Sequence, residues 1–76
     1  MRDDEARLAG LISDLSGIGR SRVLITTGAQ EQIVGVVVVA EGADDMANRV
    51  KMIRCVEKAT GATVDQIEIF EMSNGG

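Results

Sequence analysis

The first part of the chain has the spacing of an amphipathic helix. Its apolar residues recur at i, i+3, i+4 and i+7 and are Leu8, Leu11, Ile12 and Leu15. Acidic residues favour the start of a helix, so Asp3 or Asp4 is expected to cap it. Gly17 is expected as the left-handed residue that follows the last turn. The pattern predicts a helix over about residues 4–16.

Two segments rich in β-branched residues follow, separated by a short turn. Ser21–Thr27 and Gln32–Ala40 both favour strands, because valine, isoleucine and threonine pack well on a pleated surface. Residues 28–31 begin with glycine and predict a turn, so the two strands should form an antiparallel hairpin. Four consecutive valines, Val36–Val39, do not alternate with polar residues. Both faces of the second strand are therefore expected to be apolar.

A second helix and a third strand complete the pattern. The loop Glu41–Asp45 ends in an expected N-cap, and a helix is predicted from about Met46 to Ala59, with Gly61 after its last turn. The expected apolar arc of this helix is Met46, Val50, Met52, Ile53, Val56 and Ala59. Its expected solvated stripe is Lys51, Arg54 and Lys58. A third strand is predicted over Ile67–Met72.

The order helix–strand–strand–helix–strand predicts an α+β fold. Two helices cannot enclose a sheet of three short strands, so both are expected on one face, giving a two-layer α/β sandwich. The crossover through the second helix should join parallel strands with a right-handed connection. The 76 residues allow a single domain, 1–76, with a core over about 4–72 and a frayed tail at 73–76.

Composition removes several classes of function. The chain has no His, a single Cys and one aromatic residue, Phe70, and it carries 8 basic against 12 acidic residues. We therefore expect that the chain is not an enzyme and has neither a cofactor nor a metal site. Histidine, the usual acid–base group and zinc ligand, is missing, and one cysteine cannot form a thiolate metal cluster. The net charge of −4 and the lack of stacking aromatics disfavour nucleic acid. The longest apolar run, Ile33–Ala40, is about half a membrane-crossing helix, so the chain is expected to be soluble.

One glycine-rich turn suggests a hypothesis of nucleic-acid binding. Gly17-Ile18-Gly19, with Arg20 and Arg22 close behind, is similar to the hairpin of helix–hairpin–helix DNA-binding motifs, which hold a phosphate with backbone amides and cations. The following residues favour a strand where that motif needs a second helix. A phosphate loop would also need the glycines before a helix rather than after one. A helix cap followed by a turn is the simpler interpretation.

Another set of residues is typical of a contact between proteins. If Ile67 and Ile69 face the helices, Phe70 points away from them, together with alternate valines, either Val36 and Val38 or Val37 and Val39. An apolar sheet face on a small domain commonly marks a protein contact. Arg interrupts the apolar arc of the second helix, where it either snorkels to solvent or joins a contact. The candidate interface residues are Phe70, Val37, Val39, Arg49 and Arg54.

The sequence also resembles a known family. The segments that carry the likeness are Leu15–Gly19, Arg22–Thr26 and, most distinctively, Gly35–Asp44 with its Val-Val-Val-Ala-Glu-Gly-Ala stretch. Over about residues 5–72 the chain is similar to the soluble domain of stage III sporulation protein AG. That family contributes to the channel between mother cell and forespore in endospore-forming bacteria. Its domain is a ring-building motif also found in secretion-system rings.

The resemblance implies a function without catalysis. Copies would associate side by side into a ring in the space between the two membranes, with other sporulation channel proteins as partners. Family members also carry a long insertion between the first two strands, where this chain has only residues 28–32, and an N-terminal membrane anchor that these residues lack. The leading hypothesis is an oligomerisation module. The alternatives are a nucleic-acid-binding domain using Arg20 and Arg22, and a small-molecule or regulatory module.

Overall fold

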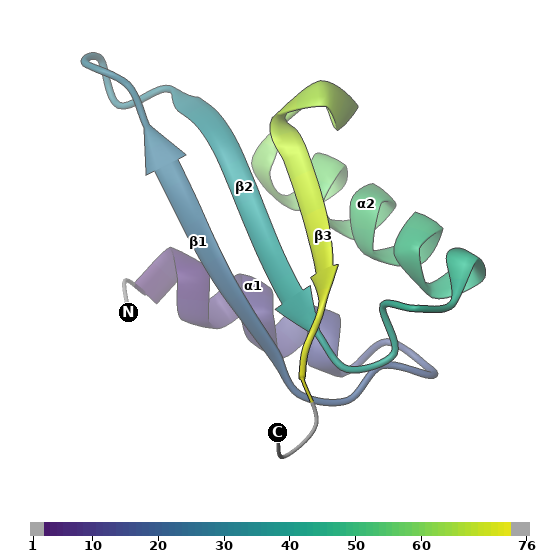
Figure 1. Cartoon of the computed structure of the whole chain (residues 1–76). Coiled ribbons are helices and arrows are strands. Elements are labelled where there is room, and N and C mark those ends of the chain that lie inside the picture. The colour runs from purple at the N-terminus through teal and green to yellow at the C-terminus, as the bar shows by residue number, and fades with distance from the viewer. Residues whose placement is uncertain (1–2, 74–76) are drawn as a thin grey trace.

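The computed structural model describes residues 3–73. These residues fold into two helices and a three-stranded sheet in the predicted order (Figure 1). The elements are α1 (Asp3–Ser13), β1 (Ser21–Thr27), β2 (Ile33–Ala40), α2 (Met46–Thr60), the short 3₁₀ turn η1 (Val64–Gln66) and β3 (Ile67–Glu71). The turn η1 is an addition to the prediction. Residues 74–76 of the expected frayed tail lie outside the described residues.

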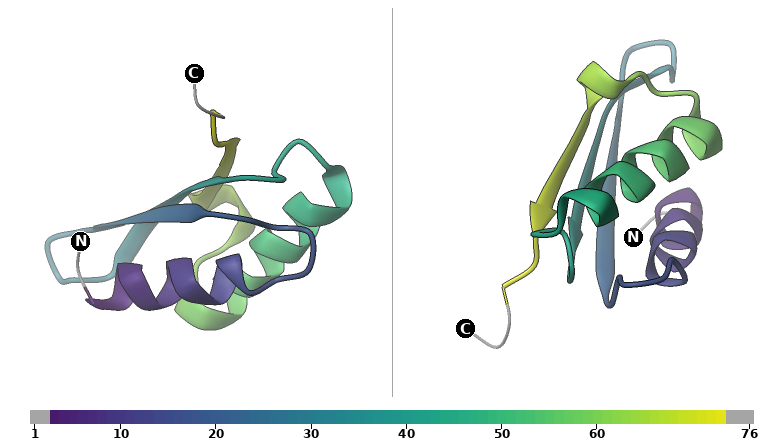
Figure 2. Two further views of the ribbon diagram at one scale, coloured as in Figure 1. Left: turned by 90° about the horizontal axis from the view of Figure 1, so that it is seen from below. Right: turned by 90° about the vertical axis from the view of Figure 1, so that its right-hand side faces the viewer.

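The sheet has the strand order β1-β2-β3. β1 and β2 form the predicted antiparallel hairpin, in which Leu24 pairs with Val37. β2 and β3 are parallel, as predicted for strands joined through a helix, and Val39 pairs with Phe70. Both helices lie on one face of the sheet, so the two-layer α+β sandwich is confirmed (Figure 2). With the helices behind the sheet and β3 to the right of β2 in Figure 1, the crossover is right-handed.

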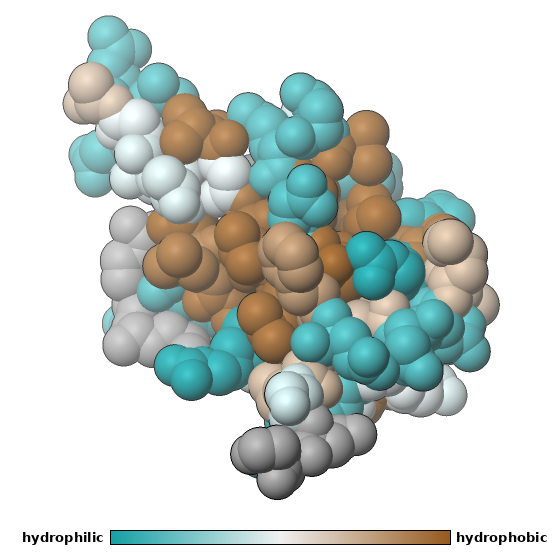
Figure 3. Space-filling model, viewed as in Figure 1, coloured by the Kyte–Doolittle hydropathy of each residue, from teal (hydrophilic) through white to brown (hydrophobic). Residues whose placement is uncertain are grey.

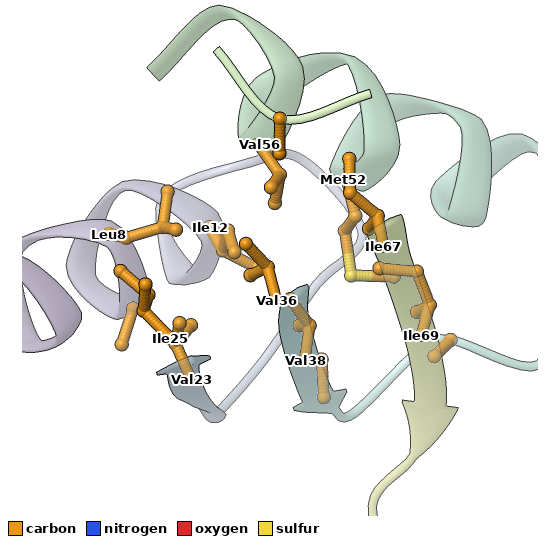
Figure 4. Close-up of a cluster of buried hydrophobic side chains, with 14 of the residues drawn as sticks. Leu8, Ile12, Val23, Ile25, Val36, Val38, Met52, Val56, Ile67 and Ile69 are labelled. Atoms are coloured by element: carbon orange, nitrogen blue, oxygen red, sulfur yellow. The ribbon is translucent and has the colours of Figure 1, made fainter. Parts of the chain in front are cut away.

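The core lies between the sheet and the helices (Figure 4). Alternate residues of each strand point into it, as the period of two requires. The buried strand residues are Val23, Ile25, Val36, Val38, Ala40, Ile67 and Ile69. The helices and loops cover them with Leu8, Ala9, Ile12, Ile18, Ala43, Met52, Val56 and Ala62. Ile67 and Ile69 therefore face the helices, as supposed from the sequence, and Val23 and Ile25 of β1 do so as well.

The first helix is shorter than predicted, because the chain leaves it to bury Ile18. α1 ends at Ser13, and hydrogen bonds from Leu15 N to Ile12 O and from Ile18 N to Leu15 O tighten the chain into turns. These turns place Ile18 in the core with 8% exposure. Gly17 has the predicted positive φ of 88°, but it lies in this later turn and not directly after the helix. The two candidate N-caps, Asp3 and Asp4, lie inside the first turn of α1.

The second helix is rotated relative to the prediction. Its caps are as expected: Asp45 accepts a hydrogen bond from Ala47 N at 2.8 Å, and Gly61 is left-handed with φ 77°. Its buried residues, however, are Asn48, Met52 and Val56. Three members of the predicted arc, Met46, Val50 and Ala59, are exposed instead. The reason is a pair of buried hydrogen bonds, because the Asn48 amide donates to the backbone carbonyls of Gly17 and Gly42. These bonds turn the face of the helix that carries Asn48 toward the core.

Candidate functional site

An apolar surface covers the side of the sheet that faces away from the helices. We call it the outer sheet face and define it by Leu24, Val37, Val39 and Phe70, which occupy the strand positions opposite to the core. Leu24 is 58% exposed and Phe70 is 52% exposed, while the two valines between them are half-buried. Figure 3 shows the corresponding hydrophobic area in the middle of this face, across all three strands. Three of the five predicted interface residues are therefore together on one surface.

Charged residues border this surface at both edges of the sheet. The register places Arg22, Val39 and Phe70 in one row across the strands. It places Leu24, Val37 and Glu68 in the next row. Each row thus combines apolar residues with one charge, basic at the β1 edge and acidic at the β3 edge. An apolar centre with a charged rim is the usual arrangement of a protein–protein interface.

The other two predicted interface residues, Arg49 and Arg54, lie on α2, on the opposite side of the molecule. Arg54 is exposed. Arg49 is half-buried, and its guanidinium donates two hydrogen bonds within the chain, from Nη1 to Ala43 O at 2.9 Å and from Nη2 to Ile69 O at 2.8 Å. Arg49 therefore connects the loop before α2 and the strand β3. Neither arginine belongs to the outer sheet face.

A shallow groove between the two helices has an apolar floor and one basic wall. It has a volume of about 610 Å³ and is lined by Leu11, Leu15, Lys51, Arg54, Cys55, Lys58 and Ala59. Lys51 Nζ donates to Ser16 O at 2.9 Å and so ties α2 to the turn after α1. Burial raises the pKa of the Cys55 thiol, which suits a packing cysteine rather than a reactive one. The basic wall consists of Lys51, Arg54 and Lys58, the stripe of α2 that the sequence predicts to face solvent.

The glycine-rich turn proposed for phosphate binding uses its amides within the chain. Ile18 N donates to Leu15 O, Gly19 N donates to Glu41 O, and Arg20 N donates to Glu41 Oε1 at 2.7 Å. The Arg20 backbone N–H, and then its guanidinium 3.4 Å from Oε2, lower the pKa of the Glu41 carboxyl. A Cβ at residue 19 would lie 2.5 Å from Glu41 Oε1, so a side chain there would displace this carboxylate. The backbone amides of Gly19 and Arg20 therefore bind Glu41.

A second hollow lies where β1 and β2 meet the end of β3. It has a volume of about 820 Å³ and is lined by Ser13, Arg20, Ser21, Arg22, Val39, Met72 and Ser73. The hydroxyls of Ser13 and Ser21 are hydrogen-bonded to each other at 2.8 Å, and Ser21 Oγ also donates to Ala9 O at 2.7 Å. Arg20 is paired with Glu41, whereas Arg22 forms no ion pair with residues 3–73. Ser13 and Ser21 thus connect α1 to β1, and Arg20 is held by Glu41.

Among residues 3–73, no three His, Cys, Asp or Glu side chains are close enough together to hold a metal ion. In the same part of the chain, neither helix has the length and apolar character needed to cross a membrane. No family model matches the sequence, and no curated protein matches it significantly.

Proposed function

We propose that this chain is a non-enzymatic module that assembles with copies of itself into a ring through the outer sheet face. We further propose that the ring belongs to the channel between mother cell and forespore, in the space between the two membranes, with other channel proteins as partners. The channel assignment is supported by the sequence resemblance over residues 5–72. The observation that carries the assembly function is the apolar outer sheet face.

The hydrophobic effect favours covering this face. Leu24 and Phe70 are more than half exposed, and with Val37 and Val39 they form one continuous surface rather than scattered apolar residues. Each Å² of apolar surface removed from water contributes about 25 cal/mol. Phe70 is the only aromatic residue of the chain, and aromatic anchors often dominate the energy of an interface. We therefore assign Phe70 as the centre of the contact.

The opposite side of the molecule offers a complementary surface. The groove between the helices carries Lys51, Arg54 and Lys58, whereas the outer sheet face is bordered by Glu68 at the β3 edge. A contact between these two different surfaces is head-to-tail, and head-to-tail contacts close into rings when the rotation allows it. Arg54 remains a proposed polar partner across the contact. Arg49 is left out of it, because its guanidinium already binds two carbonyls of its own chain.

We do not propose nucleic-acid binding or a small-molecule site. The amides of Ile18, Gly19 and Arg20, which would have to hold a phosphate, are already donated within the chain. The net charge of −4 also repels a phosphate backbone on average. The hollow beside Arg22 offers mainly polar groups that are already hydrogen-bonded.

The test is assembly under crowding on a surface, since small interfaces are weak until copies are concentrated. The chain, tethered by a histidine tag to a nickel-lipid monolayer, is examined by electron microscopy for rings or arcs. Phe70→Asp should keep the circular dichroism spectrum of the wild type and abolish assembly. Val64→Asp is the matched control, because Val64 is 57% exposed but lies in η1, outside the outer sheet face.

Three results would contradict the proposal. The first is a Phe70→Asp variant that unfolds, which would place Phe70 in the core. The second is a folded Phe70→Asp, Val37→Asp and Val39→Asp series that assembles like wild type, which would place the interface elsewhere. The third is a tight dimer that resists dilution during sedimentation of the untethered chain, where we expect a monomer or reversible larger species.

A further inference from the structure

The open edge of β3 is occupied by an arginine from the helix layer. β3 is the last strand of the sheet, and Met72 N donates to Ala40 O in β2. The backbone groups of successive residues in a parallel strand point alternately toward and away from the neighbouring strand. Met72 points toward β2, so Ile69, three residues earlier, points its N–H and C=O toward the open edge. There the carbonyl of Ile69 accepts the hydrogen bond from Arg49 Nη2 at 2.8 Å. A second bond, from Nη1 to Ala43 O at 2.9 Å, fixes the orientation of the guanidinium.

The β3 sequence is suited to pairing with itself. An antiparallel pair of two β3 strands centred on Ile69 would place Glu68 opposite Phe70 of the second copy and Ile67 opposite Glu71 of the second copy. No like charges would then face each other, and isoleucine and phenylalanine favour strand pairing. In this register the two Ile69 residues would exchange backbone hydrogen bonds at the two-fold axis. Their carbonyls are the acceptors that this exchange needs.

We propose that Arg49 prevents this pairing and thereby excludes one mode of self-association. Its guanidinium occupies the Ile69 carbonyl, and a second copy would bring a second guanidinium to the same axis, where like charges repel. Unpaired sheet edges invite strand addition, and proteins commonly protect them with charged side chains. The β1 edge has a similar protection, because Ile25 N donates to Glu5 Oε2 at 2.7 Å. The inference holds for any self-association of this chain and does not rest on the proposed function.

The first experiment compares Arg49→Ala with Arg54→Ala by sedimentation velocity over a wide concentration range. Both variants remove one positive charge from α2, but the Arg54 side chain is exposed and forms no hydrogen bond with residues 3–73. We expect Arg49→Ala to self-associate at least about tenfold more tightly than Arg54→Ala or wild type. Equal association of the two variants would overturn the proposal.

The second experiment tests the geometry by cross-linking. In a background carrying Cys55→Ala and Arg49→Ala, single Glu68→Cys and Phe70→Cys chains are oxidised separately and as a mixture. Positions 68 and 70 would be opposite each other only in the antiparallel pair centred on Ile69. We expect a cross-linked dimer mainly in the mixture and not when Arg49 is retained. Association of the Arg49→Ala chain without this mixed cross-link would also overturn the proposal.

A third variant keeps the test decisive if Arg49→Ala does not fold. Arg49→Gln removes the charge but keeps an amide that can donate to one of the two carbonyls. Folding of each variant is checked by circular dichroism and urea unfolding. We expect the Arg49→Gln chains to give the mixed cross-link above the level of Arg54→Ala chains. A folded Arg49→Gln that stays monomeric and does not cross-link would overturn the proposal.

Discussion

The carboxylate of Glu5 accepts a hydrogen bond from the backbone N–H of Ile25 at 2.7 Å, although the two residues are 20 positions apart. Glu5 is only 5% exposed, so an acidic side chain of α1 is buried against the edge of β1. A buried polar group is stable only when it is hydrogen-bonded. This contact therefore fixes the first helix on the sheet.

The first prediction concerns this contact. Glu5→Ala should lower the free energy of unfolding by about 1–3 kcal/mol, because it leaves a buried N–H without its acceptor. Glu5→Gln keeps an acceptor oxygen of similar shape and should lose clearly less. Urea unfolding followed by circular dichroism measures both. If the two variants are equally stable, the hydrogen bond to Ile25 does not hold α1.

The second prediction concerns Asn48, which joins both loops at one end of the molecule. Its Nδ2 donates to Gly17 O at 3.2 Å and to Gly42 O at 3.0 Å. Asn48→Ala should lower the free energy of unfolding by about 1–3 kcal/mol. Asn48→Asp should be worse, because a carboxylate would face two carbonyl oxygens. Thermal unfolding at neutral pH tests the order, and an Asp variant as stable as wild type would contradict it.

The third prediction tests which way β3 faces. Ile67 is 7% exposed and faces the helices, whereas Phe70 is 52% exposed on the outer sheet face. Ile67→Ala should cost about 2–5 kcal/mol, enough to unfold much of so small a domain. Phe70→Ala should cost less than about 1 kcal/mol. If urea unfolding shows that Ile67→Ala is nearly as stable as wild type, Ile67 does not face the helices.

The fourth prediction is a pH dependence from Glu41. Its pKa is lowered in the folded protein, chiefly by the Arg20 backbone N–H. A lowered carboxyl pKa stabilises the fold above the ordinary glutamate pKa, and this stabilisation is lost as the pH falls through the lowered value. Wild type should therefore be more stable than Glu41→Gln at neutral pH, and the two should converge in acid.

A control for this prediction separates the two causes of the lowered pKa. Arg20→Ala removes the guanidinium but keeps the backbone donor, so it should retain most of the pH dependence. The effect is small, because the Arg20–Glu41 pair is solvent-exposed. A constant difference between wild type and Glu41→Gln at every pH would contradict the assignment.

The fifth prediction concerns nucleic acid. We expect no binding tighter than about 10 μM to generic DNA or RNA at physiological salt, given the net charge of −4 and the amides used within the glycine-rich turn. Fluorescence anisotropy with labelled duplex and single strands measures it. Submicromolar affinity would contradict both this prediction and the proposed assembly function.

The strands were the most predictable part of this protein. Ser21–Thr27 is a strand with the predicted bounds, and the hairpin, the parallel crossover and the facing of Ile67 and Ile69 are also as predicted. These features follow from local chemistry, because β-branched residues favour a pleat and side chains alternate with a fixed period of two. The same alternation places Phe70 outside once Ile67 and Ile69 face the helices. Which pair of valines lies beside it, Val37 and Val39 rather than Val36 and Val38, was decided only by the register of the strands.

Tertiary structure decided how the helices are oriented and what their polar residues do. Met46 and Val50 were expected inside but are exposed, because the Asn48 amide donates to Gly17 O in a distant turn and to Gly42 O in the loop before α2, and so turns its face of α2 inward. Arg49 was expected either to reach solvent or to join a contact between proteins, yet it binds Ile69 O across 20 positions. Helical periodicity gives the spacing of a stripe but not the partners of its polar residues. Those partners come from loops and strand edges that meet only when the chain has folded.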